Sequence, residues 1–444
     1  MTVFILELIV VLAALAVGAR VGGVGLGVWG GVGLAVLIFG FGAAPTTPPI
    51  DVMLIIIAVI TAASVMEAAG GIDWLVGLAE RIIRAHPQYI TLVAPLVSYA
   101  FTFAAGTGHI VYPLLPVIYE VAYENGIRPE RPIAISTIAS QQAITASPVS
   151  AATAVMIGLL AGKGMTLLHI LAICLPATLL AVTIAALVQT RVGRELADDP
   201  EYRRRVAAGQ LTPPRKSSAT DTPPAPVAVG GKASALVFLV GVALVVIAGA
   251  FPSLRPEFLV DGQRERLSMP VTIEIIMLTV AAVMLVVTKV PVGTVPTTRT
   301  AQAGATAVVG IFGLAWMGDT FIAHNREIVI GGLSEMAQAY PILFAVGLFA
   351  ASVLLYSQAA TARALMPLGL QLGLPAPSLI AAFPAVNGYF FLPNYGTIIA
   401  AINFDRSGTT GIGRYVLNHS FMLPGLVATW GAVLIGLVIA KLLF

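Results

Sequence analysis

The stretch LLYSQAATARALMP, from Leu354 to Pro367, begins as apolar as a membrane span and then becomes polar. Ser357, Gln358 and Thr361 follow closely, and Arg363 comes next before the chain turns apolar again. A charged side chain at membrane depth costs about 2.5–3.5 kcal/mol even on the lenient insertion scale, so it faces a cavity or a partner. The stretch is therefore not an ordinary lipid-facing span.

The rest of the chain has the composition of a membrane protein. Of its 444 residues, 58% are hydrophobic and only 10% are charged, whereas soluble globular proteins carry about 25% charged residues. Several apolar runs have the length of about 20 residues that a helix needs to cross a bilayer, and they lack the alternation of a β-barrel. We therefore expect an all-α polytopic membrane protein. With one cysteine, Cys174, the chain has no internal disulfide, and we expect Cys174 to be a core residue.

Residues 191–232 differ from the apolar runs on either side. This segment is first charged and then rich in Pro, Ser and Thr. Such a composition cannot bury a core, so it predicts a flexible linker. The linker divides the chain into a first half at 1–190 and a second half at 233–444.

The two halves contain matching hairpin sequences. The first half reads GTGHIVYPLLP at 106–116 and the second reads SQAATARALMP at 357–367, and each stretch ends in a proline. Short apolar runs flank both stretches. We predict a re-entrant hairpin at 88–123 and another at 340–373. The tip of each hairpin is expected at the polar residues that begin the stretches 106–116 and 357–367.

Each half also contains an apolar helix with an internal break, at 132–163 and at 377–403. Two prolines with the same spacing open each helix and mark its break, namely Pro132 and Pro148 in the first half, and Pro377 and Pro393 in the second. In this register Gln142 corresponds to Asn387. A single proline is ordinarily a simple helix kink, but the matched spacings and the polar residues at both breaks favour a repeat.

The distribution of Lys and Arg predicts the orientation. If the linker is cytoplasmic and both hairpins are re-entrant, about ten spans remain and most basic residues lie on the cytoplasmic side, as the positive-inside rule requires. Both termini are then periplasmic. The first hairpin enters from the inside and the second from the outside, which makes the halves an inverted-topology repeat, a common architecture of secondary transporters.

The hairpin tips and helix breaks are the places where chemistry is expected. Backbone that is not helical at membrane depth must be buried in protein or line a watery cavity. Half-helix N-termini there carry partial positive charge and suit carboxylates, whereas unwound carbonyls suit Na⁺ or another cation. The candidate substrate-binding residues are Gly106, Thr107, Gly108, His109, Gln142, Ser147, Ser150, Ser357, Gln358, Thr361, Arg363, Asn387, Asn394 and Thr397.

Each candidate also has a structural alternative. The polar cluster around Gln142 could join helices by hydrogen bonds, and His109 could be a satisfied interfacial histidine. Arg363 could pair with Asp319 or extend to the surface; otherwise its planar fork fits a carboxylate bidentately. The Gly-rich stretch at 22–33 is typical of close helix packing.

Motifs of several other protein classes are absent from the sequence. It contains no HExxH, GxSxG or Walker motif, so we expect neither an enzyme nor direct use of ATP. The net charge of +3 is small, and we expect no nucleic-acid partner. No cofactor is expected and no metal site can be assigned, while Na⁺ or H⁺ are candidate coupling ions.

Several blocks, in order along the chain, resemble the anaerobic C4-dicarboxylate transporter (Dcu) family of bacterial inner membranes. They are GARVGGVGLGVWGGVG (18–33), PPIDVMLIIIAV (48–59), GTGHIVYPLLPVIYEVA (106–122), IRPERP (127–132), ITASPVSAA (144–152), LLYSQAATARALMP (354–367) and SGTTGIGRYVLNHSFMLPG (407–425). The sequence departs from the family pattern at Arg363, where Lys is more usual, and at 392–397, where LPNYGT replaces a motif like LPTYPT.

The resemblance implies antiport of fumarate, succinate, malate and aspartate across the inner membrane. It also implies a superfamily whose members use two re-entrant hairpins, an elevator-like motion and often a homodimer, with lipid as the surrounding partner. Three alternatives stay open: a carrier for another organic anion such as citrate, gluconate or lactate, a channel, and a membrane sensor that binds dicarboxylates.

Overall fold

The computed structural model is mostly helical. It describes residues 2–21, 24–48, 50–213, 230–260, 263–325, 340–355, 357–393, 395–413 and 417–444. Within these ranges the only strands form one short antiparallel hairpin, β1 (Glu257–Val260) with β2 (Gln263–Arg266). The all-α class expected from composition is therefore confirmed.

Five helices in the described part of the chain are long and apolar enough to cross a membrane. The number becomes six if the bent pair formed by α3 (Ile50–Ala68) and α4 (Gly71–Ala85) counts as one span. Such a set is what a multi-pass membrane protein requires. The sequence count of about ten spans also includes shorter and interrupted helices, and it stays a prediction.

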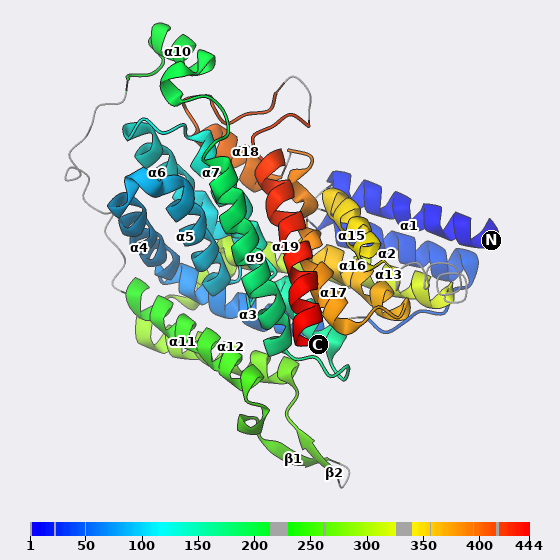
Figure 1. Ribbon diagram of the computed structural model, residues 1–444. Helices are drawn as coiled ribbons and strands as arrows, with labels where there is room; N and C mark the ends of the chain where they lie inside the picture. Colours follow the sequence, from blue (N-terminus) through cyan, green and yellow to red (C-terminus); the bar gives the residue numbers. More distant parts are fainter. Residues whose placement is uncertain are drawn as a thin grey trace.

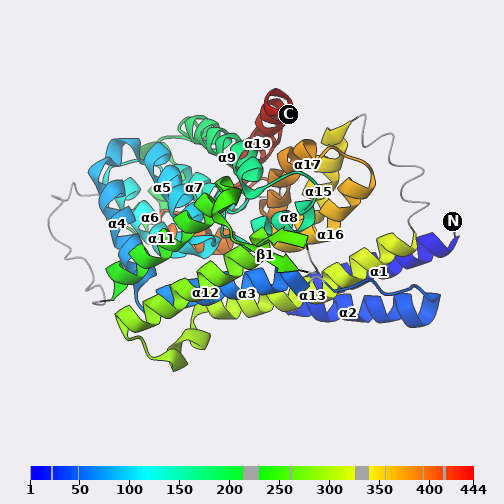
Figure 2. The same cartoon turned by 90° about the horizontal axis from the view of Figure 1, so that it is seen from below.

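The helices are arranged in two layers (Figures 1 and 2). The first layer consists of α1 (Thr2–Val21), α2 (Gly25–Ala35), α3, α12 (Met269–Thr288) and α13 (Arg299–His324), and α11 (Gly231–Ala250) packs on α12. The second layer holds α5 (Ile90–Ala105), α6 (Val111–Glu124), α7 (Glu130–Ile144), α8 (Ala151–Leu160), α9 (Leu167–Gln189), α15 (Pro341–Leu355), α16 (Gln358–Gln371), α17 (Ala376–Ala382), α18 (Gly396–Phe404) and α19 (Met422–Leu443).

The two halves of the chain interlock within the second layer. Helix α9 packs along α19, α6 packs against α18, and α16 packs against α8. In the last two pairs, the returning limb of one predicted hairpin contacts the broken helix of the other half. These reciprocal contacts are compatible with the predicted inverted repeat.

Helices end at each of the four places where the sequence predicts a tip or a break. Between α5 and α6 the chain passes through Gly106, which has a φ of 71°, a left-handed conformation that glycine adopts without steric cost. Between α7 and α8 it passes through Pro148. In the second half, α15 gives way to α16 at Ser357, and a 3-10 helix, η7 (Phe383–Phe390), precedes the break before α18.

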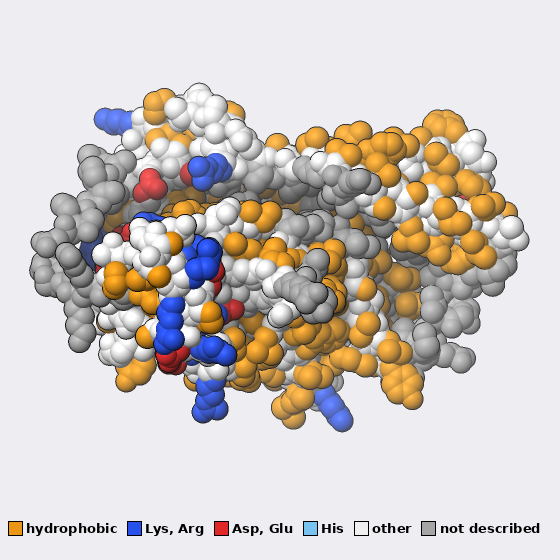
Figure 3. Space-filling model, turned by 90° about the horizontal axis from the view of Figure 1, so that it is seen from above, with side chains coloured by type: hydrophobic (Ala, Val, Ile, Leu, Met, Phe, Trp, Pro, Cys, Tyr) orange, Lys and Arg blue, Asp and Glu red, His pale blue; other side chains and the backbone are white. Residues whose placement is uncertain are grey.

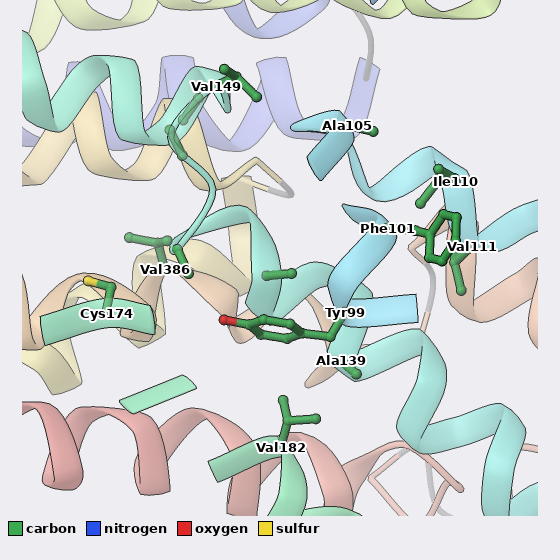
Figure 4. Close-up of a cluster of buried hydrophobic side chains, with 14 of the residues drawn as sticks. Tyr99, Phe101, Ala105, Ile110, Val111, Ala139, Val149, Cys174, Val182 and Val386 are labelled. Atoms are coloured by element: carbon green, nitrogen blue, oxygen red, sulfur yellow. The ribbon is translucent and has the colours of Figure 1, made fainter. Parts of the chain in front are cut away.

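The second layer has a dense apolar core. Tyr99 of α5 lies among Ala139, Val182 and Val386, which come from α7, α9 and η7 (Figure 4). The Tyr99 hydroxyl is hydrogen-bonded to Thr178 Oγ1 at 2.7 Å, so its polar end is satisfied. Cys174 is fully buried on α9, which confirms that it is a core residue.

Within the predicted flexible linker at 191–232, residues 191–213 have defined local structure, and the linker as a whole stays a prediction. Here a short helix, α10 (Pro200–Ala207), begins at Asp199, whose carboxylate accepts hydrogen bonds from the N–H groups of Glu201 and Tyr202. Arg128 binds the same carboxylate at 2.6 Å. Burial opposes ionisation of Asp199, but these hydrogen bonds outweigh it and lower its pKa. Composition alone did not reveal these specific contacts; residues 214–229 lie outside the described residues.

Helices α2 and α13 are packed closely through glycine. A Cβ atom added at Gly27 would lie 2.0 Å from the carbonyl oxygen of Val309, and one at Gly313 would lie 1.8 Å from the carbonyl oxygen of Gly27. Only glycine allows the two backbones to approach this closely. Close packing, predicted from the Gly-rich stretch at 22–33, is confirmed at Gly27.

Replacing Gly27 by Ala should therefore destabilise the protein. The added methyl group forces α2 and α13 apart, at a cost of about 1–3 kcal/mol, which should lower the midpoint of thermal unfolding of the detergent-solubilised protein. Gly31→Ala on the same helix is the matched control, because a Cβ atom there meets nothing within 4 Å. An equal effect of the two substitutions would contradict the packing account.

Candidate functional site

The two hairpin tips and the two helix breaks meet at one cavity of about 670 Å³. Its lining includes residues 106–108 and 357–360 from the tips, and residues 149–152 and 395–397 from the breaks. Helices α3 and α13 supply further lining residues, among them Ile56 and Thr300. The cavity therefore lies between the first layer of helices and the four interruptions of the second.

Glycines let the first tip approach the first break closely. A Cβ atom at Gly106 would lie 2.7 Å from the carbonyl oxygen of Val149, and one at Gly108 would lie 2.3 Å from Nε2 of Gln141. Larger residues at these two positions would push the tip away from the break. Thr107 lies between the two glycines and also lines the cavity.

Several α-helices begin at the cavity, among them α8, α16 and α18. Ser150 caps α8 by accepting a hydrogen bond from the N–H of Thr153 at 3.1 Å, and Ser357 caps α16 by accepting one from the N–H of Ala360 at 3.2 Å. The third helix, α18, begins at Gly396 without a side-chain cap. Helix N-termini carry partial positive charge and unpaired N–H groups, so their convergence favours a bound anion.

A chain of side-chain amides runs from the cavity into the core. Gln358 donates to the side-chain oxygens of Gln141, at 2.9 Å, and Asn387, at 3.2 Å. Asn387 in turn donates to Gln142 at 3.1 Å, and Gln142 donates to Thr429 at 2.7 Å. The network joins α16, α7, η7 and α19, and it brings the predicted register pair Gln142 and Asn387 into direct contact.

Half of the predicted site residues line the cavity: Gly106, Thr107, Gly108, Ser150, Ser357, Gln358 and Thr397. Gln142 and Asn387 lie behind the lining, in the amide network. Ser147 and Thr361 are buried and donate to the carbonyl oxygens of Phe103 and Ser357, at 2.7 and 2.8 Å. Asn394 and the side chain of His109 lie outside the described residues.

Arg363 is not among the residues that line the cavity. Its guanidinium lies 3.3 Å from a carboxylate oxygen of Asp319, and only 13% and 21% of the two side chains are exposed. The structure therefore contains the ion pair that the sequence left open as an alternative. Because Asp319 is on α13 and Arg363 is on α16, the pair links the two layers.

The cavity lining also includes residues that were missing from the predicted set, among them Tyr112, Gln141, Arg299 and Tyr395. Of the adjacent glutamines, the repeat register selected Gln142, whereas Gln141 is the one that reaches the cavity. Arg299 begins α13 after its N-cap Thr298, and it is the one charged side chain among the described lining residues. In the sequence Arg299 lies in a loop between apolar runs, so it was counted only among the basic residues that predict membrane orientation.

The comparisons with known proteins agree with one another. The family model of the anaerobic C4-dicarboxylate membrane transporters matches residues 3–444. A C4-dicarboxylate transporter DcuA from Wolinella succinogenes is 40% identical over 439 residues, covering 99% of both chains. The DcuA of Escherichia coli K12 is 43% identical over 440 residues, covering 98% of this chain and 99% of its own. An anaerobic C4-dicarboxylate transporter DcuB from Escherichia coli O6:H1 is 37% identical over 444 residues, covering 99% of both.

Breaking the amide network should destabilise the fold. Asn387→Ala leaves the buried amides of Gln142 and Gln358 with fewer partners, and each unsatisfied buried group costs about 1–3 kcal/mol. Thermal unfolding of the purified protein measures the loss. Asn403→Ala, at an exposed asparagine of α18, is the matched control. A network variant as stable as this control would contradict the account.

The pair formed by Arg363 and Asp319 predicts a rescue. Arg363→Gln leaves Asp319 as a partly buried, uncompensated charge, which costs up to about 3–5 kcal/mol, so folded protein and transport should both fall. Adding Asp319→Asn removes that charge and should restore both.

Yield of folded protein and rate of substrate uptake in vesicles measure the effect. If the double variant folds normally but transports no better than Arg363→Gln, then Arg363 acts on the substrate as well as on Asp319.

Proposed function

Because the chain belongs to the family of anaerobic C4-dicarboxylate membrane transporters, we propose that it exchanges C4-dicarboxylates such as fumarate, succinate, malate and aspartate by antiport across the bacterial inner membrane. The observation that carries this proposal is the cavity at which two hairpin tips and two helix breaks converge. The substrate binds there, between the two layers of helices.

The chemistry of the lining suits a small dianion. The N-terminal turns of α8, α16 and α18 present partial positive charge, and Arg299 adds a full one. The described lining residues include neither Asp nor Glu. Gln358 donates a hydrogen bond to the side-chain oxygen of Gln141 at 2.9 Å. This bond fixes the orientation of the remaining hydrogen-bonding groups of both side chains. Preorganised polar groups of this kind bind without a large loss of side-chain entropy.

Exchange follows from the electrostatics of the empty cavity. Without an anion, the converging helix N-termini of the second layer disfavour movement of the site through the apolar membrane interior. A dicarboxylate neutralises this charge, and the loaded site then crosses more readily than the empty one. Counter-transport of a second dicarboxylate is the consequence.

The layers provide the moving parts of an elevator-type carrier. The tips and breaks belong to the second layer, whereas α3 and α13 on the opposite side of the cavity belong to the first. In this proposal the second layer carries the substrate past the first. The pair formed by Arg363 and Asp319 crosses that boundary, so it must break and reform in each cycle.

The surface charge supports a cytoplasmic location for α10. Lys and Arg side chains gather at the end of the molecule that carries α10, whereas hydrophobic side chains dominate the region of α1 and α2 (Figure 3). Under the positive-inside rule the basic end faces the cytoplasm, and both termini then face the periplasm. The proposal therefore includes an inner-membrane protein with a cytoplasmic segment between its halves.

Counterflow in proteoliposomes tests the function. Vesicles preloaded with unlabelled succinate should take up labelled fumarate or aspartate, while empty vesicles should not. After it releases its substrate, the carrier returns across the membrane readily only if it binds a second substrate molecule. Competition by citrate, gluconate and lactate should be weak. The proposal fails if no C4-dicarboxylate supports counterflow, or if uptake is uncoupled and electrical, as in a channel.

A further inference from the structure

The N-termini of α8, α16 and α18 at the cavity are not equivalent. Ser150 and Ser357 already occupy part of the N-terminal turns of α8 and α16, whereas α18 has no side-chain cap. In that open turn Thr397 is only 2% exposed, and its hydroxyl oxygen has no hydrogen-bond partner. A hydroxyl that is this buried and has no hydrogen-bond partner within the protein is free to bind a polar ligand atom in the cavity.

A cationic side chain from the other layer lies near this turn. Tyr112 of α6 is in contact range of the turn, because a Cβ atom at Gly396 would lie 2.7 Å from its hydroxyl oxygen. Tyr112 also interacts electrostatically with Arg299 of α13. Arg299, Tyr112, Gly396 and Thr397 all line the same cavity, so the open turn and the arginine form one cluster.

The groups in this cluster match those that a carboxylate requires. An ionised carboxylate is an acceptor only, with two oxygens and about four lone-pair sites. The first turn of α18 offers backbone N–H groups and the Thr397 hydroxyl, and Arg299 offers the guanidinium that forms the strong, charge-assisted hydrogen bonds. No other described lining residue supplies a formal positive charge.

We propose that Arg299 and the first turn of α18, through Thr397, together hold one of the two carboxylates of the substrate. The inference rests on the proposed function and names the residues that select a substrate with a second acidic group. Arg299 comes from the first layer and Thr397 from the second, so this subsite is complete only when the layers are aligned as in this structure. The arginine is then released when the second layer moves.

Single substitutions test the subsite in the counterflow assay. Thr397→Val and Arg299→Gln should each raise the KM for succinate by about tenfold or more, since each removes a hydrogen bond to a charged group. Arg299→Lys keeps the charge and should recover part of the loss. Thr183→Val and Arg204→Gln, at positions outside the cavity, are the matched controls and should retain the KM of the wild type.

The double variant separates a shared carboxylate from two independent effects. If Arg299 and Thr397 hold the same group, Arg299→Gln combined with Thr397→Val should raise KM by less than the product of the single effects, because the first change already displaces the carboxylate. A simple product would overturn the inference.

Binding to purified protein provides a readout for variants that do not transport. Succinate should raise the thermal unfolding midpoint of the wild type, and the same concentration should raise it less in both single variants. Wild-type protein that exchanges succinate, together with variants that retain its KM and its succinate-induced shift, would overturn the subsite alone. Wild-type protein without counterflow would instead overturn the proposed function.

Discussion

The hydrogen bond between Gln142 and Asn387 is the interaction on which the rest of the site depends. These residues correspond to each other in the predicted repeat, and they meet at 3.1 Å where α7 and η7 come together. Each also binds a further polar group, Thr429 or Gln358. Non-helical backbone at membrane depth must be enclosed by protein, and this network ties together the elements that enclose it.

The same constraint explains the position of the cavity. Four interruptions of helical structure have to be shielded from lipid, and their convergence lets them shield one another while leaving room for a ligand. The uncovered side is closed by α3 and α13, which belong to the other layer. The result is a cavity with several polar groups at a boundary between two groups of helices. That is the arrangement needed for a site that faces the two sides of a membrane alternately.

Sequence patterns located the interruptions better than the individual contacts. Glycine, proline and clustered hydroxyls have strong local effects on backbone conformation, so both tips and both breaks could be placed. Which side chain of an adjacent pair faces the cavity depends on helix rotation, and this is why Gln142 was chosen instead of Gln141.

Contacts between segments that are distant in the sequence could not be predicted in this way. Arg299 reaches the cavity from a distant helix, and no local sequence pattern indicates that it lies there. Arg363 was predicted to bind substrate, with an ion pair to Asp319 as the alternative, and the packing of α13 on α16 brings that pair together. Likewise, α10 is held by Arg128, a residue far away in sequence.

Cysteine labelling with substrate protection tests most directly whether the two halves build a single site. The native Cys174 is fully buried, so the chain itself provides an unreactive background. Ala151→Cys and Ala359→Cys would place thiols in the cavity from the first and second halves, and Thr190→Cys provides an exposed control. The account predicts that succinate slows maleimide labelling of both cavity thiols over the same concentration range and leaves the control unchanged. Protection of one cavity thiol without the other, or of neither, would contradict a shared site.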